Sequence, residues 1–237
     1  MMSDKTDDFA FELIPHSAIR KAIAARVSQS CREIPQFDLH TELDATALVD
    51  TRNFYKTETA ETEHKPGYND FLLHVCSRTL LKHRALNAHY SENGIRLFQD
   101  ANIGFAVASD KGVLMPVIHK AQKKDLMQIS CENGRLVALA QKARLRAGAQ
   151  MHGTFSISSL GGYGIASFNA VISPPQVAIL AAGAIDRRPW IDEGTVVVRP
   201  TLRLTLTVDH RVVDGAQAAS FLMDLKTMLE NYSPHIK

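Results

Sequence analysis

The sequence has few cysteines and no long apolar run, and each absence excludes a class of protein. Its three cysteines, Cys31, Cys76 and Cys131, stand far apart, without a CxxC pair or a neighbouring histidine cluster. This pattern argues against a disulfide framework or a structural metal site, so we expect reduced, mostly buried thiols in a cytoplasmic protein. No apolar stretch is long enough to cross a membrane, and the acidic N-terminus does not resemble a signal peptide.

Strong charge of one sign is also missing. The 27 Lys and Arg residues nearly balance the 25 Asp and Glu residues, and they are spread along the chain, which argues against nucleic-acid binding. Neither an internal repeat nor a low-complexity linker divides the 237 residues. We therefore predict one α+β domain over residues 14–237, preceded by a flexible tail at residues 1–13.

The first half of the domain reads as helices around one strand. Ile19, Ile23 and Val27 recur every four residues, which predicts a helix with one buried face that ends near Pro35. Residues 37–44 alternate between apolar and polar, the period of a strand with one wet side.

A helix with a dense apolar set is expected next, over residues 71–80. Asn69 and Asp70 are candidates to cap its start, and the apolar density predicts that it is deeply buried.

The second half alternates strands and helices. Short apolar runs over residues 95–118 predict two or three strands, and residues 123–146 predict one long amphipathic helix. A buried strand is expected at 177–185, followed by two further strands within 195–208. The leucines beyond Gly215 share one side of a closing helix.

Chemistry is concentrated in the segment TLTVDHRVVDG. A predicted strand ends at Val208, His210 follows it directly, and Asp214 with Gly215 starts the closing helix. A histidine exposed at such a boundary can accept a proton near neutral pH, because its reference pKa is about 6.5. For an isolated HxxxDG pattern, a loop histidine with an ordinary helix cap at Asp214 is the commoner arrangement, so the spacing alone does not assign a catalytic role.

The longer string DHRVVDGAQAASFL resembles the signature of the acyltransferase component of 2-oxo acid dehydrogenase complexes. The segments GTFSISSLGGYGIASFNAVISPPQVAILAAGAI and IPQFDLHTELDATAL are similar to further blocks of that family, in the expected order. The resemblance implies a chloramphenicol acetyltransferase-like fold, a two-layer α/β sandwich with a mixed sheet and flanking helices. It also implies homotrimers that build a cubic or dodecahedral core (a 24-mer or a 60-mer), with active sites between subunits.

The same resemblance implies roles for individual residues. His210 would be the general base that removes the thiol proton from CoA or dihydrolipoamide. Ser158, among three neighbouring serines, matches the oxyanion partner of the family. Asp214 would hold the histidine loop in register, with Arg20 as a candidate partner, and Ser109 would contact CoA.

No metal and no tightly bound cofactor is needed for this chemistry, because CoA is a substrate and the lipoyl group is supplied by a separate domain or chain. Gln36 departs from the histidine that the family often has there, so the acyl preference stays open. Two alternatives remain at this point: an acyltransferase of the same fold acting on another small acceptor, and an inactive scaffolding core.

Overall fold

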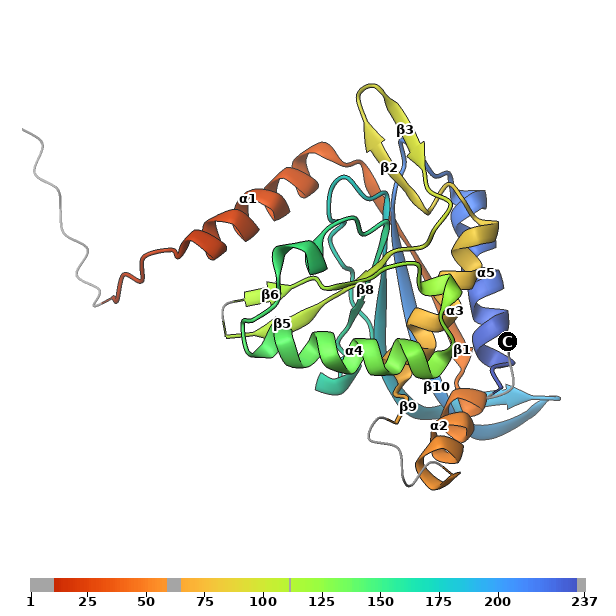
Figure 1. Cartoon of the computed structure of the whole chain (residues 1–237). Coiled ribbons are helices and arrows are strands. Elements are labelled where there is room, and N and C mark those ends of the chain that lie inside the picture. The colour runs from red at the N-terminus through yellow and green to blue at the C-terminus, as the bar shows by residue number, and fades with distance from the viewer. Residues whose placement is uncertain (1–10, 59–64, 111, 234–237) are drawn as a thin grey trace, which may run out of the picture.

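A mixed sheet of six strands forms the centre of the molecule (Figure 1). The computed structural model describes residues 11–58, 65–110 and 112–233. The strands run in the order β1 (Gln36–Asp44), β10 (Thr195–Asp209), β9 (Ala178–Asp192), β8 (Phe155–Ser159), β4 (Ile103–Phe105) and β7 (Val117–Ile118). Strand β8 pairs in parallel with β4 and β9, and all other neighbours are antiparallel.

Two hairpins stand apart from this sheet: β2 (Ala88–Ser91) with β3 (Gly94–Leu97), and β5 (Val107–Ser109) with β6 (Gly112–Leu114). The helices are α1 (Ala18–Glu33), α2 (Thr46–Glu58), α3 (Tyr68–Lys82), α4 (Leu126–Gln141) and α5 (Gly215–Glu230). Short 3₁₀ turns lie at Ala121–Lys123, Ala147–Gln150 and Gly161–Tyr163. This arrangement confirms the predicted α+β class.

The core lies between the sheet and the helices. The even-numbered residues Leu202, Leu204, Leu206 and Val208 of β10 lie on one face of the strand, because successive side chains point to opposite faces, and all four belong to the main hydrophobic core. Helix α3 packs between α5 and α4, and α5 also contacts β1 and β10. The predicted central helix is therefore confirmed, with the apolar residues predicted within 71–80 almost completely buried.

The start of α3 differs in detail from the prediction. The N-cap is Gly67, not Asn69 or Asp70. The Asp70 carboxylate instead accepts a hydrogen bond from the Gly67 amide at 2.8 Å, three residues back. Asp70 thus satisfies a free amide at the helix end from inside the first turn.

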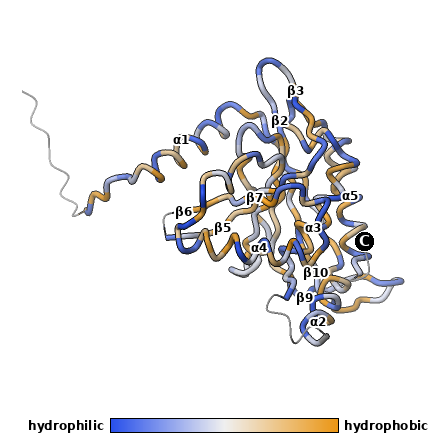
Figure 2. The backbone as a smooth tube through the Cα atoms, viewed as in Figure 1, coloured by the Kyte–Doolittle hydropathy of each residue, from blue (hydrophilic) through white to orange (hydrophobic). Residues whose placement is uncertain are grey.

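Helix α1 projects from the body of the molecule, so the prediction of a buried face is wrong within one protomer (Figure 1). Its tube alternates between hydrophilic and hydrophobic residues along its length (Figure 2), as an amphipathic helix does. Ile19 and Val27 nevertheless remain 39% and 44% exposed. Ser30, near its C-terminal end, is buried and donates to the Ile172 carbonyl at 2.7 Å.

Strand β10 is one continuous strand, where the sequence predicts two. Pro200 does not break it, because its carbonyl accepts from Ala45 N at 2.8 Å on the β1 side, and the proline nitrogen points the same way, beyond the end of the β1 ladder. The long helix predicted at 123–146 is shorter, since α4 runs only from Leu126 to Gln141.

The cysteine prediction is only partly correct. All three cysteines are free, but Cys31 and Cys131 are exposed and only Cys76 is buried. Residues 1–10 of the predicted tail lie outside the described residues. Within the described part of the chain, no helix is both long and apolar enough to span a membrane.

Candidate active site

His210 lies on the turn between the carboxyl end of β10 and α5, with an exposed side chain. Its amide donates to the Pro35 carbonyl at 3.0 Å, and its ring packs against Phe37, with 4.5 Å between ring centroids. The amides of Val212 and Val213 both donate to the Asp209 carbonyl at 3.0 Å, which closes the turn. The imidazole has no hydrogen bond to any described residue, so its nitrogens are available to a substrate.

The residues on either side of His210 form an ion pair. The Asp209 side chain is almost completely buried and accepts from Arg211 Nε at 2.9 Å, from Arg211 Nη2 at 2.7 Å and from the Arg211 amide at 3.0 Å. These hydrogen bonds raise the pKa of Arg211 above its ordinary value, although burial opposes the shift. The ion pair bridges the histidine from both sides and constrains the path of the turn.

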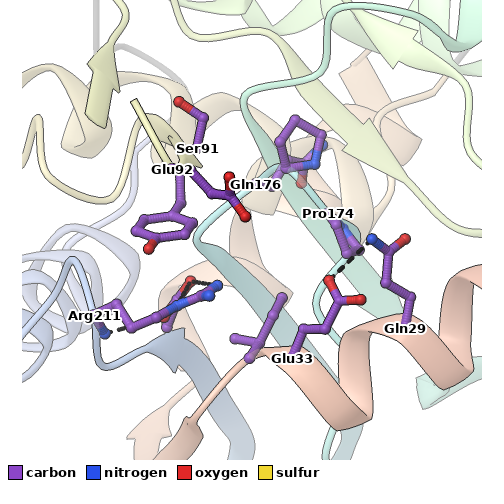
Figure 3. A pocket seen from close by; sticks show the side chains of 11 residues that line it. Gln29, Glu33, Ser91, Glu92, Pro174, Gln176 and Arg211 are labelled. Carbon is purple, nitrogen blue, oxygen red and sulfur yellow. Dashed lines mark hydrogen bonds and ion pairs between the residues drawn. The ribbon is translucent and has the colours of Figure 1, made fainter. Parts of the chain in front are cut away.

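A pocket of about 490 Å³ opens beside this turn (Figure 3). Asp209 and Arg211 lie on one wall, and the end of α1 supplies Gln29 and Glu33. Its remaining lining comes from Ile34 just after α1, from the β2–β3 hairpin and from the loop at 174–176. This volume falls in the range of small-molecule sites.

Ser158 lies on the opposite face of the sheet. It pairs with Ala181 of β9, which pairs with Thr205 of β10, which pairs with His40 of β1, so these four side chains form one row. The row faces away from the helices, whereas His210 packs against Phe37 on the core side. The Ser158 hydroxyl makes no hydrogen bond to the residues the structure describes.

The other candidate serines have different environments. Ser156 is buried and donates to Gln176 Oε1 at 2.6 Å, a structural hydrogen bond. Ser159 pairs with Ala182 and therefore points to the opposite face from Ser158. Of the three serines, only Ser158 is partly exposed on the sheet face that points away from the helices and has a hydroxyl free to donate there.

One protomer does not bring Ser158 and His210 together. Ser158 is level with Thr205, two strands away from β10, and His210 follows Thr205 by five residues. With strands about 4.8 Å apart and a rise of about 3.3 Å per residue, the two Cα atoms lie roughly 20 Å apart. A single substrate carbonyl cannot contact both side chains of the same protomer.

The chain after β8 is packed tightly at its glycines. A Cβ on Gly183 of β9 would lie 2.0 Å from the Ala166 carbonyl oxygen, and one on Gly161 would lie 2.6 Å from the Gly183 carbonyl oxygen. Only glycine permits this approach of backbones. The segment that follows Ser158 is therefore fixed against the neighbouring strand.

Asp214 is the N-cap of α5. Its carboxylate accepts from the Gln217 amide at 2.8 Å, and the Gln217 side chain accepts from the Asp214 amide at 3.2 Å, a reciprocal capping box. Among the described residues, no ion pair joins Asp214 to Arg20. The suggested Arg20 partnership is therefore absent from the protomer, because Arg20 lies on the projecting helix α1.

Ser109 ends β5, and its hydroxyl donates to the Gly112 carbonyl at 2.6 Å across the β5–β6 turn. A CoA contact from this side chain stays a prediction. Asp209 and Arg211 were not predicted as site residues. The signal in the sequence that could have found them is an acidic and a basic residue directly flanking the histidine.

Comparison with known proteins places the chain in a family. Residues 9–236 match the model of the 2-oxoacid dehydrogenases acyltransferase (catalytic domain). The dihydrolipoyllysine-residue acetyltransferase component of the pyruvate dehydrogenase complex of Rickettsia prowazekii is 34% identical over 226 residues, 95% of this chain and 55% of that protein. The chain spans about half the length of the curated relatives that it matches.

Solved structures agree. The dihydrolipoamide acetyltransferase of Azotobacter vinelandii, from a study of one serine, one histidine and one asparagine in its catalytic mechanism, has a TM-score of 0.92 and 28% identity, covering 98% of this chain and 96% of that one. The cubic core of a pyruvate dehydrogenase multienzyme complex gives a TM-score of 0.92 at 29% identity, with 98% and 96% covered.

A chloramphenicol acetyltransferase structure aligns with a TM-score of 0.56 over 90% of this chain and 96% of that one. At 13% identity this likeness concerns the fold alone, and it confirms the predicted chloramphenicol acetyltransferase-like architecture. The family resemblance expected from the sequence is confirmed by the family model and by the relatives. The chain belongs to the family of 2-oxoacid dehydrogenases acyltransferase catalytic domains.

Proposed function

We propose that this chain catalyses acyl transfer between CoA and dihydrolipoamide, with His210 as the general base and Ser158 as the oxyanion donor. The observation that carries the proposal is the exposed imidazole of His210, which is held on a fixed turn and has no partner among the described residues. Asp214 fixes the start of α5 next to it.

The residue spacing of the Azotobacter vinelandii enzyme supports these roles. The serine and histidine studied there are separated by as many positions as Ser158 and His210 are here. The asparagine follows that histidine by the same interval at which Asp214 follows His210. Both Asn and Asp offer a side-chain oxygen that can cap a helix.

The reaction needs only these groups. The imidazole of His210 takes the proton of the bound thiol as its sulfur attacks the thioester carbonyl carbon, and the carbonyl electron pair moves to the oxygen. The Ser158 hydroxyl donates a hydrogen bond to that oxyanion. When the intermediate collapses, the carbon–sulfur bond to the departing thiol breaks and the imidazolium returns the proton to that sulfur.

We infer that the site forms between two protomers of a homotrimer. The roughly 20 Å between Ser158 and His210 requires that a carbonyl between them be contacted by His210 of one protomer and Ser158 of the next. Helix α1 projects without cover, and Ile191 and Val196 at the end of the β9–β10 hairpin are 74% and 69% exposed, as at unburied interfaces. The similar cubic core makes further assembly of trimers the expected state.

The substrates would be supplied from outside this domain. CoA and acyl-CoA bind as substrates, a separate lipoyl domain or chain presents dihydrolipoamide, and we propose a cytoplasmic setting. Acetyl is the acyl group in the names of the relatives, so acetyl-CoA is the first substrate to test.

The direct test compares acetyl, succinyl and branched-chain acyl exchange between CoA and dihydrolipoamide in the wild type and in His210→Ala. Exchange of one acyl group that His210→Ala abolishes, at unchanged particle mass, supports the proposal. Exchange that persists in His210→Ala contradicts the role of the histidine, and no exchange with any acyl group contradicts the function.

A further inference from the structure

Tyr90, in strand β2 of the β2–β3 hairpin, covers the ion pair that brackets His210. The Arg211 guanidinium carbon lies 3.8 Å from the centre of the Tyr90 ring, well within the range of a cation–π contact. The same guanidinium donates through Nε and Nη2 to the two oxygens of the buried Asp209 carboxylate. Arg211 is therefore held between an aromatic ring and a carboxylate, and 30% of its side chain is exposed.

The hairpin that carries Tyr90 is itself anchored. The Tyr90 amide donates to the Pro175 carbonyl at 2.9 Å. The neighbouring His89 has Nε2 at 2.8 Å from the Gly153 carbonyl oxygen, and its ring packs edge-on against Phe98, with centroids 4.5 Å apart. The ring face of Tyr90 is thus a fixed surface, against which Arg211 can be held.

Removing this ring would expose Arg211 to water on the pocket side (Figure 3). A solvated arginine has more rotamers available. Water would then compete with the Arg211 guanidinium for hydrogen bonds to the Asp209 carboxylate. Asp209 would keep its position, because its side chain is buried and its amide donates to the Val177 carbonyl at 2.8 Å. Of the two residues in the ion pair, Arg211, which directly follows His210, would therefore be the one that gains mobility.

We propose that Tyr90 is a positioning residue for His210, which acts through Arg211 and Asp209. The proposal rests on the function proposed above and adds a part of the chain that lies 120 positions from the histidine. A general base must stay within hydrogen-bond reach of its proton, and a displacement of about 1 Å can cost about 100-fold in rate. The β2–β3 hairpin thereby supports the catalytic turn, without contact between Tyr90 and the reacting atoms.

The chain provides a matched control. Arg52 lies over the ring of Tyr68 at 4.9 Å, a second cation–π pair, between α2 and α3 and outside the candidate site. Tyr68→Leu removes a ring of the same kind without touching the histidine turn. Tyr90→Phe keeps the ring face that contacts Arg211 and removes only the hydroxyl.

The experiment measures kcat and KM for acyl exchange in the assembled Tyr90→Leu, Tyr90→Phe and Tyr68→Leu proteins. It also measures, by peptide mass mapping, the rate at which diethylpyrocarbonate modifies His210. We expect Tyr90→Leu to lower kcat at least about tenfold with KM changed less than about threefold, and to change the rate of His210 modification. Tyr90→Phe and Tyr68→Leu should match the wild type in both measurements.

Wild-type kcat in Tyr90→Leu would overturn the proposal. So would equal losses in Tyr90→Leu and Tyr68→Leu that follow the amount of assembled protein, since these would reflect stability alone. Failure of the proposed function is distinguishable, because it appears as exchange that survives in His210→Ala. In that case an unchanged rate of His210 modification in Tyr90→Leu would still refute positioning, and a changed rate would still support it.

Discussion

Ser158 and His210 share one property at the scale of the residue: each presents a polar side chain that the described part of the protomer does not satisfy. Their neighbours do the opposite, since Ser156 donates to Gln176 and Asp209 is saturated by Arg211. Because both side chains are also accessible from outside the protomer, each is available to hydrogen-bond to a substrate.

The serine role predicts a defined loss of rate. Ser158→Ala should lower kcat for acyl exchange by about 100- to 1,000-fold, the usual effect of removing one oxyanion donor, with less effect on KM. The matched control is Ser159→Ala, because Ser159 points to the other face of β8. Steady-state kinetics of both variants check this, and equal losses in the two would refute the assignment.

A buried histidine outside the site makes stability depend on pH. His74 is 2% exposed, and its Nδ1 is hydrogen-bonded to the Tyr232 hydroxyl at 3.0 Å. Burial, and to a lesser degree the charge of Arg78, lowers the pKa of His74 to about 4, while Asp125 opposes the shift. The neutral ring is therefore the form that the native state requires.

Between the unfolded pKa of 6.5 and the native pKa of about 4, the unfolded chain binds the proton and the native chain does not. The free energy of unfolding should consequently fall as the pH is lowered through this window and level off below it. Denaturant titrations at several pH values should give a smaller slope for His74→Gln than for the wild type. The exposed His40→Gln serves as control, and parallel curves for the wild type and His74→Gln would contradict the account.

At the scale of the element, helix α5 depends on its N-cap residue, Asp214. Asp214→Ala should remove the N-cap and cost about 1 kcal/mol of stability, because the Gln217 amide loses its acceptor. Asp214→Asn keeps a side-chain oxygen at the same place and should remain near wild-type stability. Unfolding midpoints measure the difference, and an Asn variant as unstable as the Ala variant would argue that charge, not capping, is what matters.

The elements differ in how far the sequence predicts them. Strand β1 and helices α3 and α5 were predictable, because each buries its apolar residues at its own period against this chain. The continuity of β10 was not predictable from the sequence, because it depends on where Pro200 falls relative to the end of β1, which only the sheet register determines. Helix α1 was predicted as a helix, but its apolar face was predicted to be buried. In one protomer, Ile19 and Val27 of this face are exposed.

The candidate site was predictable to a similar degree. The family motif named His210, Ser158 and Asp214, and the cap at Asp214 follows from the local sequence. The ion pair at Asp209 and the ring of Tyr90 depend on contacts between distant segments. Sequence periodicity carries no information about such contacts.

At the scale of the whole molecule, the proposed mechanism needs more than one protomer. Ser158 and His210 lie on opposite faces of one sheet, and the projecting helix α1 and the end of the β9–β10 hairpin leave apolar side chains in water. A trimer resolves both features at once if His210 of each protomer faces Ser158 of the next. Cyclic symmetry then creates as many identical sites as there are protomers.

The most direct test of this account is complementation between two inactive variants. His210→Ala and Ser158→Ala, co-expressed and purified as mixed assemblies, restore an intact pair wherever a protomer with His210 adjoins one with Ser158. Random mixing in equal amounts should recover about a quarter of the wild-type exchange rate, far above either variant alone. Activity no higher than that of the two separate variants would contradict a site built from His210 and Ser158 of different protomers.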